Sequence, residues 1–345
     1  MLKIPMSMQR TSQGLQRELA RLAGSSASIQ ERSAEVLEQL GRIVAFDVGW
    51  LALRDPELRR HRPLATAGDA APLRDYFARP EADDDVEGLG LNEVRLPMLA
   101  SEIPGPLSEV RAWGEHLIPA GLRQGLAVGL FTSGGRHVGF LSLLSADRSH
   151  PSHDERNVVA ACTTVIADNL DRTREIAETA RAIQRAVAGV VLTRGGGVLP
   201  LPGLPDDRLL APGSPILAIA ADELDKGGPH ASFLVPAAET GGVRLTRVTA
   251  LDFARPELDN LACAVLLGLA DDLHGLTVLD LRVLGLLVDG LTGIPAVALA
   301  LQIAGRTVTK SLMRSMAALA TNDLTTVTLR ALRSGMRIPP AVPTS

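Results

Sequence analysis

Apolar positions near the N-terminus recur at the spacing of an α-helix. Leu15, Leu19 and Leu22 repeat at i, i+4 and i+7, and a second apolar stripe follows a Gly-Ser-Ser break. Ser28 and Glu31 stand three residues apart, which is the spacing of a capping box at a helix start. The pattern therefore predicts two consecutive helices before the first strand.

Short alternating or continuously apolar runs then predict strands. Val48–Arg54 and Arg62–Thr66 are the first candidate pair, and the clearest hairpin joins Gly125–Phe131 to His137–Leu144 through a glycine turn. A capping box at Ser152 opens an apolar stripe with helical spacing, which predicts a single helix of more than about 30 residues. A helix of that length both closes one domain and connects to the next.

The segment 189–272 returns to short apolar runs with Gly and Pro between them. Its length and punctuation predict a compact β-rich module of about 90 residues. The candidate strands are Val190–Thr193, Val198–Leu201, Pro215–Ala220, Ala231–Val235, Val243–Val248 and Ala262–Leu267.

From Leu276 onward the pattern is helical and predicts four short helices. The third has an apolar stripe on one face and cations spaced by four residues on the other. These side chains are Val308, Leu312, Met316 and Leu319 on the apolar face and Arg306, Lys310 and Arg314 on the basic face. A tight turn before such a helix describes a helix-turn-helix, in which the apolar stripe is buried and the basic face meets the major groove.

The distribution of charge agrees with this division. The chain has a formal net charge of −4, yet seven basic and only three acidic side chains lie from Leu276 onward. The C-terminal unit is therefore the part expected to meet a polyanion. Hydrophobic residues make up 46% and charged residues 21% of the 345 residues, which excludes a disordered chain, and two cysteines exclude a disulfide framework.

The sequence predicts a soluble, cytoplasmic protein that does not enter a membrane. It contains no uninterrupted run of 18 apolar residues. Its N-terminus has no charged segment leading into an apolar stretch, as a signal peptide would have.

The residue patterns of common enzymes and metal sites are missing, so we expect no enzyme, no cofactor and no metal. His150 and His153 have no third ligand nearby in sequence, which favours a surface turn over a metal site. Cys162 and Cys263 lie within apolar runs and are expected to be buried structural thiols.

Two further groups have alternative interpretations. Trp50, Trp113 and Tyr76 are expected to fill a core, with the lining of a sensor pocket as the alternative. A cluster of carboxylates lacks the spacing of an EF-hand loop, so it predicts a solvated loop and not a calcium site. Its members are Glu81, Asp83, Asp84, Asp85 and Glu87.

The C-terminal segment resembles the LuxR-type DNA-binding domain over about 65 residues. The resemblance is carried by Leu276-Thr277, Asp280-Leu281, Val283-Leu284, Gly290-Leu291-Thr292, Arg306-Thr307-Val308, Leu319 and Arg330-Ala-Leu-Arg-Ser-Gly335. It implies a transcription regulator that binds double-stranded DNA as a homodimer. The departures are Asp280 for the family's Glu, one extra residue near Pro295, and the loss of usual donors at Ala304, Thr309, Ser311 and Ala318.

The same resemblance implies roles for individual residues. The DNA-binding residues of the third helix would be Arg306, Thr307, Thr309, Lys310 and Arg314. The fourth helix would supply the dimer contact through Leu324, Val327, Leu329 and Ala331.

The N-terminal half resembles a GAF domain over residues 25–172. A helix, strands, a variable region, the hairpin around Gly134-Gly135 and a closing helix carry this resemblance. It implies a sensor or dimerisation domain with a ligand pocket on one face of an antiparallel sheet, and the small-molecule ligand is unidentified. The middle segment resembles a PAS-like module, and the whole combination resembles a group of actinobacterial regulators.

The expected fold class is α+β multidomain: a GAF-like antiparallel sheet with helices, a small β-rich PAS-like module and a C-terminal four-helix helix-turn-helix. The expected divisions are a leader and helix over 1–24, the sensor over 25–172, a connecting helix over 173–188, the middle module over 189–272 and the DNA-binding domain over 273–340. The expected function is a one-component transcription regulator. The alternative is a dimerising or ligand-binding protein whose degenerate helix-turn-helix no longer reads DNA.

Overall fold

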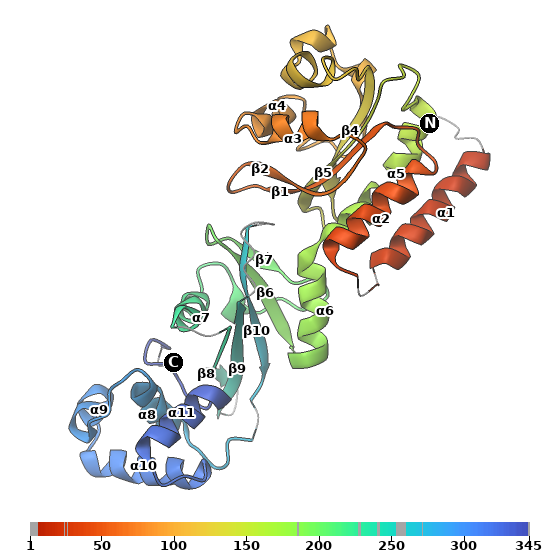
Figure 1. Ribbon diagram of the computed structural model, residues 1–345. Helices are drawn as coiled ribbons and strands as arrows, with labels where there is room; N and C mark the ends of the chain where they lie inside the picture. Colours follow the sequence, from red (N-terminus) through yellow and green to blue (C-terminus); the bar gives the residue numbers. More distant parts are fainter. Residues whose placement is uncertain are drawn as a thin grey trace. The chain divides into compact units, whose positions relative to one another are not determined.

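The computed structural model describes residues 6–343 except 24, 26, 185, 227–228, 240–241, 253–259 and 271. The chain forms two compact units, whose elements are labelled in Figure 1. Unit 1 comprises residues 1–172 and 256–260, and unit 2 comprises residues 173–255 and 261–345. Each unit contains a five-stranded antiparallel sheet together with helices, which agrees with the predicted α+β class.

The sheet of unit 1 consists of β1 (Val48–Asp55), β2 (Arg60–Ala67), β3 (Met98–Leu99), β4 (Gln124–Phe131) and β5 (His137–Ser145). Its strand order is β2–β1–β5–β4–β3. β1 pairs with its hairpin partner β2 and with the distant β5, where Leu51 lies opposite Leu141. The hairpin β4–β5 predicted from the sequence is present.

Three helices pack on one face of this sheet (Figure 1). They are α1 (Met6–Ala23), α2 (Ile29–Gly41) and α5 (His153–Leu170). Because successive strand residues point to opposite faces, Leu51, Leu53 and Leu141 reach the core under these helices while their neighbours face the other way. The predicted capping boxes begin α2 and α5 at Ser28 and Ser152.

The N-terminal helix is part of unit 1. The sequence predicted a leader and helix over residues 1–24, outside the sensor domain, but one helix already begins at Met6, and residues 1–5 lie outside the described part of the chain. Leu15 and Leu19 of α1 are buried in the core beneath α5. Their apolar stripe therefore completes the helical layer of unit 1.

The opposite face of the sheet carries short helices. They are α3 (Ala71–Phe77), α4 (Ala82–Gly88), the 3₁₀ turns η1 (Ala100–Glu102) and η2 (Leu107–Glu109), and the π-helical turn η3 (Ala112–Leu117). Trp50, Tyr76 and Trp113 are buried in the core that these elements share with the sheet, as expected. Trp50 stacks on Phe77 with ring centroids 5.5 Å apart.

The single long helix predicted after Ser152 is wrong. α5 ends at Leu170 and α6 spans Arg172–Gln184. Asp171 between them has a ψ of 96°, and its buried carboxylate accepts a hydrogen bond from the guanidinium of Arg136. The sequence could not reveal this break because the partner of Asp171 is 35 residues away.

The sheet of unit 2 consists of β6 (Ala188–Thr193), β7 (Val198–Pro200), β8 (His230–Glu239), β9 (Gly242–Asp252) and β10 (Leu261–Leu269). Its order, β7–β6–β10–β9–β8, repeats that of unit 1, with the first strand between the second and the fifth. Five of the six strands predicted in this module are therefore confirmed.

The sixth, Pro215–Ala220, is wrong because these residues begin helix α7 (Pro215–Asp225). The Ser214 hydroxyl accepts a hydrogen bond from the Ile216 amide, and Pro215 occupies the first turn, where its missing N–H is harmless. A short apolar run does not by itself distinguish a buried helix from a strand.

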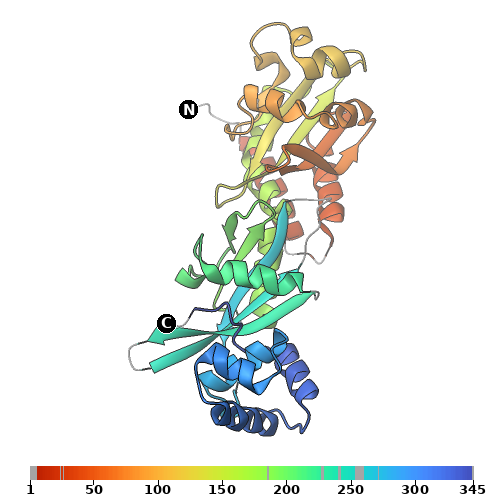
Figure 2. The same ribbon diagram turned by 90° about the vertical axis from the view of Figure 1, so that its left-hand side faces the viewer.

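The four predicted helices at the C-terminus are present in unit 2. They are α8 (Val278–Val288), α9 (Ile294–Leu301), α10 (Gly305–Ala318) and α11 (Leu324–Ser334). They do not form a core of their own: Phe233 and Val265 of the sheet, Leu284 of α8 and Val308 of α10 belong to one buried cluster. Figure 2 shows these helices, in blue, beside the hairpin β8–β9.

The segment after α11 joins the helices to the sheet. Gly335 ends α11 with a φ of 68°, and a Cβ there would lie 2.6 Å from the Ser232 hydroxyl. The Leu234 amide donates to the Arg337 carbonyl and the Ile338 amide donates to the Leu281 carbonyl, each at 2.9 Å. The segment thus bonds to β8 on one side and α8 on the other. Within the described residues, no helix combines the length and apolar character needed to cross a membrane.

Candidate functional site

Unit 1 contains an apolar cavity of about 60 Å³ between the sheet and its short helices. Rings from Tyr76, Phe77, Trp113 and Phe140 contribute to its lining, and most other lining residues are aliphatic. The Tyr76 hydroxyl is engaged, because it lies 3.2 Å from the Asp85 carboxylate. The cavity is smaller than the roughly 150 Å³ apolar cavities that take up benzene. It therefore suits a small apolar group.

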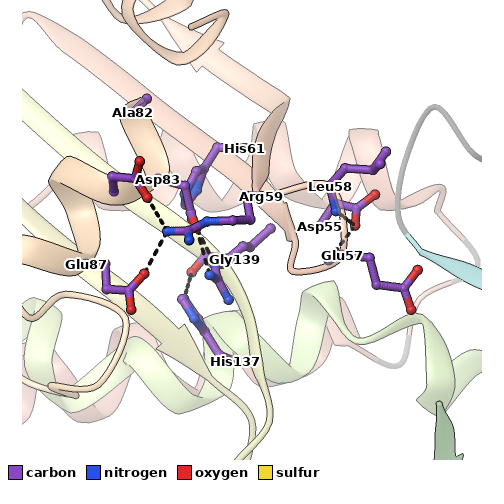
Figure 3. A network of polar contacts seen from close by, with 12 residues as sticks. Asp55, Glu57, Leu58, Arg59, His61, Ala82, Asp83, Glu87, His137 and Gly139 are labelled. Atoms are coloured by element: carbon purple, nitrogen blue, oxygen red, sulfur yellow. Dashed lines mark hydrogen bonds and ion pairs between the residues drawn. The ribbon is translucent and has the colours of Figure 1, made fainter. Parts of the chain in front are cut away.

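A buried charged cluster anchors the cover of this cavity. Val86 of α4 lines the cavity, and the first turn of the same helix carries Asp83. Two Asp83 oxygens accept hydrogen bonds from Arg54 at 2.9 Å, His61 donates from Nε2 at 2.9 Å, and Arg59 donates at 3.1 Å. We call Arg54, Arg59, His61 and Asp83 the Asp83 cluster, and Figure 3 labels Arg59, His61 and Asp83.

The Asp83 cluster corrects the prediction of a solvated acidic loop. The Asp83 side chain is fully buried, whereas Asp84 and Glu87 are exposed and pair with Arg59 at the surface. Residues 82–88 form a helix whose inner face meets the cations of β1 and of the β1–β2 turn. Of the five predicted carboxylates, Asp83 is therefore fully buried, Asp85 is half-buried beside the Tyr76 hydroxyl, and Glu81, Asp84 and Glu87 are exposed.

The surroundings of Asp83 fix its charge. Burial alone would raise the pKa of Asp83, but hydrogen bonds from His61 and Arg54 outweigh it and hold that pKa well below its usual range. Burial lowers the pKa of His61, so its imidazole is neutral and donates from Nε2. β1 and β2 are thereby tied to α4 by a carboxylate that stays ionised.

A second histidine, the half-buried His137, gives unit 1 a pH dependence. Burial, assisted by Arg54, lowers the pKa of His137 to about 4, and its Nε2 lies 2.9 Å from the Gly139 carbonyl. The unfolded chain binds this proton near pH 6.5 and the folded chain does not. The contribution of His137 to the free energy of unfolding is therefore complete above pH 6.5. It is lost as the pH falls toward 4, and the total loss is about 3 kcal/mol.

Urea unfolding of the wild type and of His137→Gln between about pH 7 and pH 4.5 measures this contribution. The variant should lose less stability over that interval, although the neutral His61 keeps part of the dependence in both proteins. Parallel curves for the two proteins across the interval would contradict the assignment.

Neither cysteine is among the residues that line the cavity. Cys162 is buried in α5 on the other side of the sheet, and burial raises its pKa to about 12. Burial and nearby carboxylates raise the pKa of Cys263 in β10 to about 11. Neither thiol is positioned to attach a ligand in this cavity.

His150 and His153 lie at the start of α5 and not at a metal site. His150 Nδ1 lies 2.9 Å from the Glu155 carboxylate, which also closes the capping box with Ser152. His153 is exposed and lies 3.8 Å from Glu102. The described part of the chain holds no group of three or more residues arranged to bind a metal ion.

The exposed face of α10 is the second candidate site. Val308 and Leu312 are buried, as the sequence predicted, while Arg306, Thr309 and Lys310 face outward. Among the described residues, Arg306 and Lys310 have no carboxylate partner. Thr307 is half-buried, and the Thr309 hydroxyl donates to the Gly305 carbonyl at 3.2 Å.

Arg314 differs from the other two cations of α10. Its Nη1 lies 2.8 Å from the carboxylate of Asp280, which is fully buried. The other oxygen of Asp280 accepts a hydrogen bond of 2.7 Å from Ser311. In the resemblance to the LuxR-type domain, Ser311 replaces a usual DNA donor, but in the structure its hydroxyl has the buried Asp280 carboxylate as a partner. Arg314 is thus held partly by its own unit, and only its exposed half is presented outward.

The predicted dimer contact of α11 needs correction. Val327 and Ala331 are fully buried in the core of unit 2, so they are not available to a partner. Leu324 is half-buried, and Leu329 is 46% exposed. Leu332, which is not among the dimer residues predicted from the LuxR-type resemblance, is 43% exposed and lies three residues after Leu329 on the outer face. The helical stripe alone did not show which side faces the sheet.

The sequence matches no protein-family model and no curated protein. Solved structures align with parts of the chain. A bacteriophytochrome from R. palustris is 11% identical to this chain, and the alignment covers 77% of this chain and 64% of the bacteriophytochrome, with a TM-score of 0.35. The chromophore-binding domain of a Stigmatella aurantiaca phytochrome is 15% identical over 48% of this chain and 60% of its own, with a TM-score of 0.33.

A GAF domain/HD domain protein from Geobacter sulfurreducens is 18% identical over 44% of this chain and 97% of its own, with a TM-score of 0.31. All three TM-scores lie below 0.5. The fold of each unit is therefore described from its own strand order and packing. This chain spans less than two thirds of the length of both phytochromes.

Proposed function

We propose that the chain is a transcription regulator, with unit 1 as a GAF-like sensor and α8–α11 as a helix-turn-helix that binds double-stranded DNA. The observation that carries the proposal is the face of α10. Arg306 and Lys310 project from it one helical turn apart and pair with no carboxylate of the described residues, while the opposite face is buried. Such a helix has cations free to contact phosphates and a rigid support that sets their spacing.

The cavity of unit 1 supports a binding role and not a catalytic one. Its lining is almost wholly apolar, its aromatic rings give contact area, and the lining residues with a hydroxyl group are Tyr76 and Ser142. A small apolar molecule is the ligand that this lining fits. We propose that the chain is not an enzyme and that ligand binding under α4 changes the packing of unit 1.

A second candidate function has a specific observation in its favour. In a helix-turn-helix the first helix crosses the phosphate backbone. α9 occupies that place in the sequence order, and its residues Ile294–Leu301 include neither a charged nor a hydroxyl side chain. Such a helix offers little to phosphates, which favours a dimerising or ligand-binding protein that has lost DNA recognition.

A salt titration separates the two functions. The full chain is mixed with a random-sequence duplex of about 30 base pairs, and binding is followed from about 50 to 200 mM salt. A DNA-binding protein should retain the duplex at low salt and lose affinity steeply as salt rises. Its basic side chains displace the counterions condensed on the DNA phosphates, and this release becomes less favourable at higher salt. No retention at about 50 mM salt, by a chain that is shown to be folded, would favour the second function.

A further inference from the structure

On the basis of the proposed function, we propose that Met313 selects a thymine through its methyl group, next to a guanine that Lys310 reads. Met313 is 67% exposed on α10. It follows Lys310 by three residues and Thr309 by four, so the three side chains share one face of the helix. The juxtaposition of an apolar side chain with a free cation on this face is the basis of the proposal.

The other side chains near Met313 are already engaged. The Arg314 guanidinium is paired with Asp280, and the Thr309 hydroxyl bonds to the Gly305 carbonyl. Lys310 and Met313 are therefore the long side chains at the middle of this face that are free to extend outward. An isolated exposed methionine would need no explanation, but this one lies beside the cations that the proposed function uses.

The chemistry of the major groove fits this pair of residues. Guanine presents two acceptors, O6 and N7, to a lysine ammonium, and thymine presents the C5-methyl group to an apolar side chain. Methionine is unbranched and polarisable, so its thioether can follow the position of that methyl group. Burying the thymine methyl against Met313 removes both apolar surfaces from water.

The spacing of the two residues predicts the spacing of the two bases. Three residues of α-helix rise about 4.5 Å, and successive base pairs are about 3.4 Å apart. Lys310 and Met313 should therefore read base pairs that are one step apart. The inference predicts a preferred site in which a guanine and a thymine occupy neighbouring pairs.

The test starts with selection of bound duplexes from a random pool by the full-length wild type, Met313→Ala and Met313→Gln. The wild type should enrich a thymine beside a guanine, and both variants should lose the preference for thymine while keeping the guanine. Leu269→Gln is the matched control, because Leu269 is 60% exposed on β10 and lies outside the four helices. It should select the same site as the wild type.

Methyl removal gives the second measurement. Replacing the selected thymine by deoxyuridine should weaken wild-type binding about fourfold, the value of one buried methyl group, and leave Met313→Ala unchanged. Equal binding of the thymine and deoxyuridine duplexes by the wild type, or a thymine preference that survives in Met313→Ala, would overturn this inference while leaving DNA binding in place. Failure of the wild type to retain any duplex would overturn the proposed function and this inference together.

Discussion

Replacing both Arg306 and Lys310 by alanine is expected to reduce duplex binding by about tenfold to a hundredfold near 150 mM salt and to leave the fold intact. Both side chains are exposed and form no ion pair with a described residue, so their removal leaves no buried charge behind. Phosphate contacts supply essentially all of the affinity for random DNA. On a random duplex, where Lys310 has no selected guanine to read, both cations should contact phosphates, and the slope of log affinity against log salt should fall by about one for each contact that is removed.

Two controls make this result specific to the face of α10. Arg333→Ala removes one cation from the last turn of α11 and should change the salt slope little. Arg314→Ala should lower the free energy of unfolding as well as DNA binding, because it leaves the buried Asp280 carboxylate with one fewer partner. Equal losses of affinity in Arg333→Ala and in the double variant would indicate a dependence on net charge and not on this helix.

Elements fixed by contacts a few residues apart could be predicted from the sequence. The capping boxes at Ser28 and Ser152 form as predicted, because each needs only a hydroxyl and a carboxylate three residues apart. The β4–β5 hairpin and the order of the four C-terminal helices follow from periodicity in the same way. Val308 and Leu312 were correctly placed on the buried side of α10.

Features that depend on distant partners could not be predicted. Asp83 belongs to an acidic run that predicts a solvated loop. Its carboxylate is buried because it pairs with Arg54, which lies 29 residues earlier in the chain. Periodicity also does not show which side of an amphipathic helix meets a sheet, so Val327 and Ala331 were assigned to a partner when they pack inside unit 2. The cavity of unit 1 is likewise assembled from several segments, and Tyr76 and Trp113 are the members of its lining that the sequence analysis named, as an alternative to their role in the core.

The sharing of one core by the sheet and the four helices of unit 2 was also not evident from the sequence. Arg337 is fully buried after α11, and its guanidinium pairs with Glu223 of α7. Lys226 directly follows α7, and its Nζ lies 2.7 Å from the carboxylate of Asp289 at the end of α8. These ion pairs join residues 63 and 114 positions apart. Under the proposed function, the helix-turn-helix would therefore move together with the sheet of unit 2.

Removing the Asp83 carboxylate is expected to destabilise unit 1 by about 3–5 kcal/mol at neutral pH. In Asp83→Ala, His61 and Arg54 keep their places in or beside the core but lose the anion that compensates them. A buried charge or donor without its partner is costly because water cannot replace the lost hydrogen bonds. Asp84→Ala is the matched control: Asp84 is 65% exposed, and its loss should cost less than about 1 kcal/mol.

The same variant tests whether the Asp83 cluster holds α4 over the cavity. Hydrogen exchange should speed up at α4 in Asp83→Ala more than at α1, which packs on the other face of the sheet. Because the folded pKa of Asp83 is depressed, its contribution is present above the unfolded value near pH 4 and disappears as the pH falls through the folded pKa. The difference between wild type and Asp83→Ala should therefore be full at pH 7 and shrink below about pH 4. Unfolding curves of Asp83→Ala that coincide with those of Asp84→Ala at pH 7 would show that the cluster does not stabilise unit 1.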